Sequence, residues 1–254
     1  MKPFQPASAR QRLDELLVNR GLFASRSRAR DAVERGTVSV EGAVVRKPGQ
    51  AVLPDVPISV DDPAQAYVSR AALKLIAGLD HFRLDVSGCE ALDVGASTGG
   101  FTQVLLERGA AHVTAIDVGH GQIHDSIAND PRVTSIEGLN ARDLTSVELG
   151  GRAPDFIVSD VSFISLKLAL PPALSLAKAG ARALLLVKPQ FEAGKDAIGK
   201  GGLLKDAADA ERVAADLQAW LDALPGWRAL GLCPSPIEGG DGNREFLLGG
   251  IKDR

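Results

Sequence analysis

The sequence predicts a doubly wound α/β domain that follows a small basic module. The stretch Cys89–Phe101 combines a short apolar run, a turn rich in glycine and an apolar pattern at helical spacing, which indicates a strand, a tight turn and a helix start. The β-branched stretch His112–Asp117 indicates the next strand, and its terminal acid lies about 20 residues past the turn, as in doubly wound folds. Residues 54–63, rich in proline and aspartate, mark the boundary between the two parts.

Length and composition agree with this organisation. The 254 residues suit one α/β domain with a small appendage, and a hydrophobic content of 45% is enough for a sizeable core. The net charge of −3 excludes a chain that coats nucleic acid along its whole length. Two distant cysteines, Cys89 and Cys233, exclude a disulfide framework and a cysteine-rich zinc site. We expect a cytoplasmic protein without membrane contact, because no apolar run approaches the roughly 18–20 residues of a membrane helix.

The basic module is predicted to contain two short helices and a β-hairpin. Leu13, Leu16 and Leu17 form one apolar stripe at helical spacing, and Ser25 can cap a second helix. The alternating stretch Thr37–Gly42 then predicts a strand that ends in a turn.

The charge of this module is opposite to that of the remainder. Residues 10–47 contain nine Lys or Arg against five Asp or Glu, a net charge of +4, whereas residues 63–254 contain 19 against 24, a net charge of −5. Arginine forks match phosphate geometry, so Arg26, Arg28, Arg30 and Arg35, on or beside the second helix, suit the backbone of a nucleic acid. A merely solvated helix surface explains these charges equally well.

The glycine turn favours a ligand other than a dinucleotide. Because they lack Cβ atoms, Gly95, Gly99 and Gly100 let a ligand approach the backbone closely. The loop reads D-x-G-x-x-x-G-G from Asp93, and Ser97 stands where the fingerprint G-x-G-x-x-G requires glycine. An acid just before the loop suits a ligand with a cationic end, such as the amino group of S-adenosylmethionine, better than a pyrophosphate. A purely structural turn is the alternative.

Asp117 adds a signal for an adenosine ligand. A doubly wound fold places a carboxylate at this strand end to accept hydrogen bonds from a ribose, and NAD enzymes share that acid. Asp117 therefore supports adenosine without choosing between cofactors. The candidate cofactor-binding residues are Asp93, Gly95, Ala96, Ser97, Thr98, Gly99, Gly100, Phe101, Asp117, Val118 and Asp160.

Later segments place charged residues at the ends of predicted strands. Asp155–Asp160 and Ala183–Phe191 contain apolar strands that end in Asp160 and Lys188, and Glu245 lies near the start of a late strand. Ligands in open α/β sheets sit beyond the carboxyl ends of parallel strands, so these residues should face the glycine loop if the late strand runs antiparallel. Taken singly, each residue can have a purely structural role. The lysine can extend from the edge of the sheet into solvent, and each acid can cap a helix.

Three stretches of the basic module, Arg12–Leu17, Ser25–Arg30 and Arg35–Gly42, resemble the S4 RNA-binding module. One departure is Glu41, where the module often has asparagine. The resemblance adds Arg12 to the candidate RNA-binding residues.

The rest of the chain closely resembles the TlyA (hemolysin A-like) ribosomal RNA 2′-O-methyltransferases of the FtsJ-like class. The motifs are Tyr67–Leu75, Leu92–Thr102, Ser159–Leu166, Val187–Glu192, Gly199–Gly202 and Gly242–Phe246. The first reads Ser-Arg-Ala-Ala where the family often has Ser-Arg-Gly-Gly. The resemblance implies a Rossmann-like methyltransferase domain with a mostly parallel seven-stranded sheet over residues 69–254. An S4 domain over residues 1–62 and a linker over residues 63–68 would precede it.

The resemblance also implies the chemistry. S-adenosylmethionine would be the cofactor, no metal would be needed, and the partner would be ribosomal RNA or a ribosomal subunit. The targets would be cytidine 2′-hydroxyls of the small-subunit RNA, the large-subunit RNA or both. The family's catalytic set falls on Lys74, Asp160, Lys188 and Glu245. Lys188 would act either as a neutral general base or as a charged group that orients the hydroxyl and stabilises a developing alkoxide.

Several alternatives compete with this interpretation. They are a pore-forming toxin, as the hemolysin label suggests, an NAD-linked oxidoreductase and a non-catalytic RNA-binding protein. Lys195, Lys200 and Lys205 lie in a glycine-rich segment that either is a solvated loop or clamps RNA.

Overall fold

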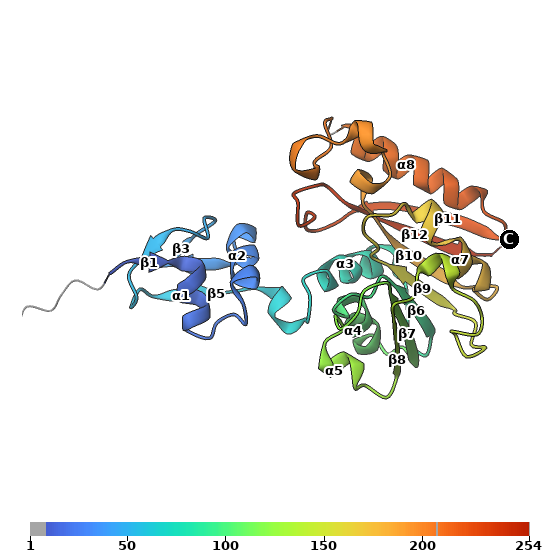
Figure 1. Ribbon diagram of the computed structural model, residues 1–254, viewed down its shortest axis with the longest axis horizontal. Helices are drawn as coiled ribbons and strands as arrows, with labels where there is room; N and C mark the ends of the chain where they lie inside the picture. The colour runs from blue at the N-terminus through green and yellow to red at the C-terminus, as the bar shows by residue number, and fades with distance from the viewer. Residues whose placement is uncertain (1–8, 207, 254) are drawn as a thin grey trace, which may run out of the picture. The chain divides into compact units, whose positions relative to one another are not determined.

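The computed structural model describes residues 9–206 and 208–253 of a chain that divides into two compact units, Met1–Ala66 and Tyr67–Arg254 (Figure 1). The division falls inside the segment 63–68 that the sequence resemblance assigns to a linker. Residues 63–66 form a 3-10 helix, η1, and belong to the first unit. Residues 1–8 of the predicted first domain lie outside the described residues.

The first unit packs two helices against short strands. Its helices are α1 (Leu13–Asn19) and α2 (Arg26–Arg35). The strand β2 (Val38–Val40) pairs antiparallel with β3 (Ala43–Val44) and β5 (Ile58–Val60), and β1 (Gln11–Arg12) pairs with β4 (Ala51–Val52). The predicted helices and hairpin are confirmed.

Local sequence explains where α2 begins and ends. The Ser25 hydroxyl accepts a hydrogen bond from the Arg28 backbone N–H, which satisfies one of the free donors at the helix start. Gly36 ends the helix in a left-handed conformation with a φ of 79°. The apolar side chains of both helices face the same core, which contains Leu13, Leu16, Leu17, Ala29, Ala32 and Val33.

The second unit is built on one seven-stranded sheet with the order β11-β12-β10-β9-β6-β7-β8. The strands β6 (Glu90–Val94), β7 (His112–Asp117), β8 (Val133–Glu137), β9 (Phe156–Ser159) and β10 (Arg182–Val187) run parallel. The strand β12 (Phe246–Lys252) runs antiparallel to both β10 and β11 (Trp227–Pro234). The fold is the predicted Rossmann-like, mostly parallel sheet.

Helices cover both faces of this sheet (Figure 1). One face is packed by α3 (Ala72–Phe82) and α4 (Gly100–Glu107), and the other by α6 (Leu166–Ala169), α7 (Pro171–Leu176) and α8 (Ala208–Ala223). A further short helix, α5 (Asp125–Ala128), precedes β8. Because both faces are buried, β9 and β10 are largely apolar rather than alternating, whereas β6 includes the buried Asp93.

The order of the strands reverses direction beside β6. The chain proceeds from β6 to β7 and β8 on one side and then returns to place β9 and β10 on the other. Doubly wound sheets bind ligands at this switch point, beyond the carboxyl ends of the strands. In the register of the sheet, Val94 of β6 pairs with Ser159 of β9, and the antiparallel β12 brings Phe246 beside Val187. Glu245 therefore lies at the same edge as the residues that follow β9 and β10.

Candidate active site

The loop between β6 and α4 is a tight turn whose backbone the sheet holds in place. The backbone N–H groups of Gly95 and Ala96 both donate to the Ile116 carbonyl at 2.9 and 3.1 Å. Gly95 and Gly99 have φ angles of 84° and 92°, which disfavour residues with a Cβ. A Cβ on Gly95 would lie only 3.0–3.1 Å from Val161. The backbone conformation and close packing of this loop therefore account for glycine at these positions.

This loop also contacts the two segments that carry candidate catalytic residues. Asp160, directly after β9, donates its backbone N–H to the Val94 carbonyl at 3.1 Å. A Cβ on Gly100 would lie 2.8 Å from the Cβ of Ser69, just before the helix α3 that carries Lys74. The glycine loop and the catalytic segments thus form one continuous region.

Asp93 lies beneath the loop rather than on its surface. Its side chain is fully buried, and Oδ2 accepts a hydrogen bond from the Thr102 hydroxyl at 2.7 Å. Burial raises the pKa of Asp93 to about 7, against the opposing effect of the Thr102 hydrogen bond. Its other oxygen has no hydrogen-bond partner among the described residues. The expectation that Asp93 faces the cationic end of a ligand stays a prediction.

Asp117, in contrast, lies beside the loop with its carboxylate fixed. Oδ2 accepts from the Ser97 backbone N–H at 2.8 Å, and Oδ1 accepts from the Gly119 N–H at 2.7 Å. Each carboxylate oxygen keeps a lone pair for a further donor. The next residue, Val118, is 67% exposed, which is unusual for a valine at the end of a buried strand. These two side chains together offer a hydrogen-bond acceptor and an apolar contact.

The four predicted catalytic residues come together from four separate segments. Lys74 comes from α3, Asp160 follows β9, Lys188 follows β10, and Glu245 precedes β12. They form two ion pairs, Lys74 with Glu245 and Lys188 with Asp160.

The Lys188 side-chain nitrogen lies close to three oxygen atoms. Its Nζ lies 2.6 Å from Asp160 Oδ1, 2.7 Å from Ser162 Oγ and 3.5 Å from the Asp160 carbonyl oxygen. The contact to Asp160 Oδ1 is an ion pair without hydrogen-bond geometry, and this oxygen has no hydrogen-bond partner among the described residues.

The Lys74–Glu245 pair is more deeply buried. The two side chains are 7% and 2% exposed, and the ammonium donates directly to Oε2 of the carboxylate. Burial raises the pKa of Glu245, while Lys74 and, to a lesser extent, Lys188 act in the opposite direction. The pair therefore holds a carboxylate in an environment that alone disfavours its charge.

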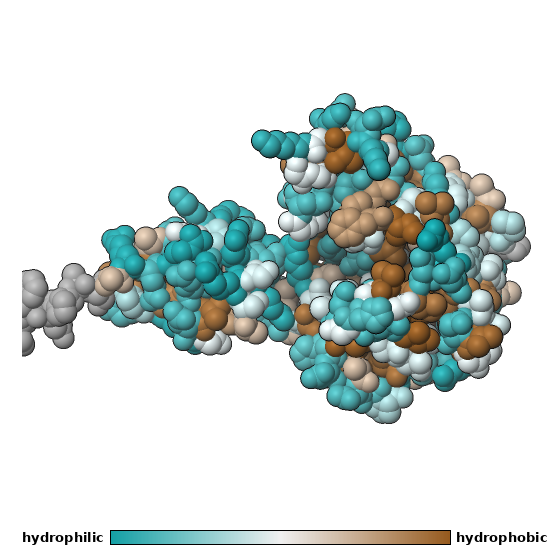
Figure 2. All heavy atoms as spheres, in the orientation of Figure 1, coloured by the Kyte–Doolittle hydropathy of each residue, from teal (hydrophilic) through white to brown (hydrophobic). Residues whose placement is uncertain are grey.

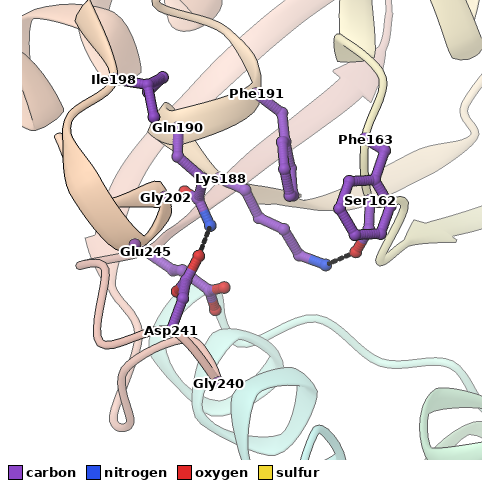
Figure 3. Close-up of a pocket in the computed structure, with 11 residues that line it drawn as sticks. Ser162, Phe163, Lys188, Gln190, Phe191, Ile198, Gly202, Gly240, Asp241 and Glu245 are labelled. Carbon is purple, nitrogen blue, oxygen red and sulfur yellow. Dashed lines mark hydrogen bonds between the residues drawn. The ribbon is translucent and has the colours of Figure 1, made fainter.

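A pocket of about 450 Å³ lies against Lys188 and Glu245 (Figure 3). On one side, Phe163 and Phe191 contact each other with ring centroids 5.0 Å apart, and Phe163 is 90% exposed at a φ of 64°. The remaining wall is formed by Ser162, Gln190, Ile198, Gly201, Gly202, Gly240 and Asp241. Across it, the Gln190 amide donates to the Asp241 carboxylate at 3.2 Å (Figure 3). The pocket thus combines an exposed aromatic surface with fixed polar groups.

The candidate RNA-binding arginines of the first unit differ in their contacts. The visible face of this unit is mostly hydrophilic (Figure 2). Arg12 and Arg26 both pair with the buried Asp14, at 3.0 and 3.1 Å. Arg35 is 13% exposed and pairs with Asp31 and, at 2.8 Å, with Asp62.

Arg28 and Arg30 lie further along the same helix. Arg28 donates to the Ala64 carbonyl at 3.1 Å. Arg30 is exposed and has no ion-pair or hydrogen-bond partner within the described part of the chain. Arg35 therefore contributes structure, whereas Arg30 leaves its guanidinium available.

Sequence reasoning did not assign several residues around the site. Ser162, Phe163, Gln190 and Glu192 all lie inside motifs that the sequence singled out, yet only contacts between segments reveal what they touch. Asp241 lies one residue before the last motif and carried no signal of its own. No group of three or more His, Cys, Asp or Glu residues that could hold a metal ion occurs within residues 9–206 and 208–253. In that part of the chain, no helix has the length and apolar character needed to cross a membrane.

Comparison with known proteins assigns both units to known domain families. Residues 67–252 match the model of the FtsJ-like methyltransferase family, and residues 11–58 match the S4 domain. The chain is 45% identical over 240 residues to the 16S/23S rRNA (cytidine-2′-O)-methyltransferase TlyA of Mycobacterium tuberculosis, covering 94% of this chain and 89% of that protein. It is 38% identical over 237 residues to hemolysin A of Brachyspira hyodysenteriae, covering 93% of this chain and 98% of that protein.

A solved structure agrees with these relationships. A hemolysin candidate from Streptococcus thermophilus superimposes with a TM-score of 0.74 at 39% identity, covering 97% of this chain and 90% of that chain. With an S4 domain followed by an FtsJ-like methyltransferase domain, the chain belongs to the TlyA (hemolysin A-like) family of methyltransferases.

Proposed function

We propose that the protein transfers a methyl group from S-adenosylmethionine to ribose 2′-hydroxyls of ribosomal RNA, with cytidines of the 16S RNA, the 23S RNA or both as targets. The observation that carries the proposal is the arrangement of two lysine–carboxylate pairs beside a glycine loop at the switch point of the sheet. The target is that of the Mycobacterium tuberculosis methyltransferase, which is 45% identical to this chain. A ribosomal target also implies a cytoplasmic location.

The residues around the glycine loop suit S-adenosylmethionine. This molecule supplies a methyl group on a positively charged sulfur. The fixed carboxylate of Asp117 lies beside the loop and can accept from both ribose hydroxyls. The exposed Val118 provides an apolar contact for a flat ring. Asp160, next to the loop, completes the wall on the side of Lys188.

Lys188 acts in this proposal as a charged group. Its Nζ lies 2.6 Å from a carboxylate oxygen of Asp160 and donates to the Ser162 hydroxyl at 2.7 Å, an arrangement that suits an ammonium. A ribose hydroxyl that replaces the exposed Ser162 hydroxyl would accept a hydrogen bond from the Lys188 ammonium. The ammonium then orients the hydroxyl and stabilises the negative charge that develops on its oxygen. Asp160 offers the nearest carboxylate for the hydroxyl proton.

The pocket and the first unit supply RNA contacts. The exposed ring of Phe163, beside Lys188, provides a surface on which an unpaired base can stack. Arg30 and, with rearrangement of their present contacts, Arg12, Arg26 and Arg28 can bind phosphates. Arg35 supports this surface from within.

A methyl-transfer assay tests the proposal. Ribosomal subunits and their naked RNA, isolated from cells that lack the protein, are incubated with isotope-labelled S-adenosylmethionine and the purified chain. The label is then mapped to nucleotides. We expect one or a few 2′-O-methylcytidines, and no incorporation with heat-denatured protein. Incorporation on a base rather than a ribose, or none on any ribosomal substrate, would contradict the proposal.

Two side measurements separate the alternatives. Calorimetry with S-adenosylmethionine and NAD should show binding of the former only. A leakage assay on phospholipid vesicles should show no release of a trapped dye, whereas release would support the pore-forming alternative.

A further inference from the structure

Glu192 connects the two segments that carry the Lys188–Asp160 ion pair. Its Oε2 accepts from the Ser165 hydroxyl at 2.5 Å, and its Oε1 accepts from the Leu166 backbone N–H at 2.7 Å. Glu192 directly follows the turn η3 (Pro189–Phe191), which begins immediately after Lys188. Ser165 and Leu166 end the loop that begins with Asp160.

The Asp160 loop is held at both ends by these contacts. At its start, the Asp160 backbone N–H donates to Val94 of the central strand β6. At its end, Glu192 binds Ser165 and Leu166. Between these anchors lie the groups that face Lys188 and the pocket.

The middle of the loop depends on these anchors. Ser162 contacts the Lys188 amine. The Phe163 ring contacts the Phe191 ring and is otherwise almost wholly exposed. Phe163 has a φ of 64°, a conformation that a bulky residue adopts only where its surroundings enforce it. The loop would therefore be expected to relax if one anchor were removed.

We infer that Glu192 is a positioning residue: by holding the end of the 160–166 loop against the turn that follows Lys188, it keeps Asp160 and Ser162 at the Lys188 amine. The inference rests on the proposed function of Lys188. Glu192 does not touch the reacting groups itself and acts through the geometry of the Lys188–Asp160 pair. A displacement of about 1 Å at such a pair can lower a rate by about a hundredfold.

The chain offers a matched control for this contact. Glu148 makes the same kind of link elsewhere in the second unit, because its carboxylate accepts from the Thr145 N–H at 2.8 Å and from the Thr145 hydroxyl at 2.6 Å. This link holds a surface turn outside the catalytic loops. Comparison of the two glutamates therefore separates loss of a loop anchor in general from loss of the anchor that serves Lys188.

The experiment measures kcat and KM for RNA methylation, together with the Kd for S-adenosylmethionine. We expect Glu192→Ala to lower kcat about tenfold or more, with KM for RNA and the Kd nearly unchanged. Glu192→Gln should recover most of the rate, because its amide oxygen can still accept from Leu166. Glu148→Ala should match the wild type. Wild-type kcat in Glu192→Ala would overturn the inference.

A double-mutant cycle with Lys188→Ala distinguishes positioning from a general loss of structure. If Glu192 acts through Lys188, adding Glu192→Ala to Lys188→Ala should not lower the residual rate further. Losses that multiply would overturn the inference while leaving the proposed function intact. Failure of the proposed function has a different signature, namely no methyl transfer to a ribose by the wild-type chain. Full activity of Lys188→Ala would remove the catalytic role of Lys188 and overturn the inference that rests on it. If Glu192→Ala does not fold, Ser165→Ala, which removes one side of the contact, takes its place in the same cycle.

Discussion

The two lysine–carboxylate pairs of the site use the same chemical groups at different depths. The inner pair, Lys74–Glu245, is 7% and 2% exposed, whereas the outer pair, Lys188–Asp160, is 11% and 18% exposed. The outer lysine also has an exposed hydroxyl, Ser162, as a third kind of partner. Glu245 reaches the pocket wall, so the inner pair adjoins the site without opening to it as Lys188 does.

This difference indicates that burial can separate a structural role from a catalytic role among charged residues of one site. A buried pair is held by the cost of leaving either charge alone, so its geometry is rigid and its removal affects the fold. In a pair that faces the pocket, a substrate hydroxyl can replace one partner at a smaller cost in free energy than in a buried pair. We therefore expect the inner pair to matter most for stability and the outer pair to matter most for chemistry.

The largest effect on stability is expected from Lys74→Met. This change leaves Glu245 buried without its cation and should lower the free energy of unfolding by about 3–5 kcal/mol. Urea titration followed by tryptophan fluorescence measures it cleanly, since Trp220 and Trp227 both lie in the second unit. Adding Glu245→Leu should restore much of the loss. A loss below about 1 kcal/mol would mean that the inner pair is not structural.

Asp93 shows what happens to a buried carboxylate that has no cation. Burial raises its pKa from 3.8 to about 7, so the folded protein favours the protonated form. This contribution to stability is fully present below about pH 4 and is lost as the pH rises through about 7. Asn cannot ionise but can accept from Thr102. The stability of Asp93→Asn relative to the wild type should therefore rise between pH 5 and pH 8, as urea midpoints can show. Parallel profiles would contradict the assigned pKa.

Asp117→Ala should affect ligand binding rather than either ion pair. It removes the fixed acceptor proposed for the ribose, and a hydrogen bond to a charged group contributes about 1.5–3 kcal/mol. We expect the Kd for S-adenosylmethionine to rise about tenfold or more in calorimetry, with the unfolding midpoint nearly unchanged. An unchanged Kd would remove Asp117 from the cofactor site.

The smallest effects are expected from two arginines of the first unit. Arg35 forms ion pairs with Asp31 and Asp62, whereas the exposed Arg30 has no ion-pair partner among the described residues. Arg30→Ala should weaken RNA binding modestly and reduce the slope of log K against log salt by about one, with stability unchanged. Arg35→Ala, which breaks the links to Asp31 and Asp62, should instead lower stability. Identical effects of the two changes on the salt slope would contradict this division.

The sequence predicts the framework of the site better than its interior. The central strands β6, β7, β9 and β10 are apolar runs that end in recognisable residues, and they lie where the sequence predicts. The edge strand β8 and the strand β11 were not predicted. β8 is only partly buried, and β11 is interrupted by a bulge near Gly231.

The roles within the site illustrate the same limit. Motifs name Lys74, Asp160, Lys188 and Glu245, but not which lysine pairs with which acid. That pairing depends on β12 running antiparallel and on α3 packing against the sheet. In the same way, the motif that ends in Glu192 does not predict its role. That role becomes visible only in the folded chain, where Ser165 and Leu166 donate hydrogen bonds to its carboxylate.

The most direct test of this account is single-turnover methyl transfer by Lys188→Ala and Lys188→Arg. We predict that Lys188→Ala keeps its tryptophan fluorescence and its affinity for S-adenosylmethionine but transfers the methyl group at least about a hundredfold more slowly. Lys188→Arg should also fail, because its planar fork does not reproduce the position of the ammonium between the Asp160 carboxylate and the Ser162 hydroxyl. Near-normal transfer by Lys188→Ala would contradict the assignment of catalysis to the outer pair.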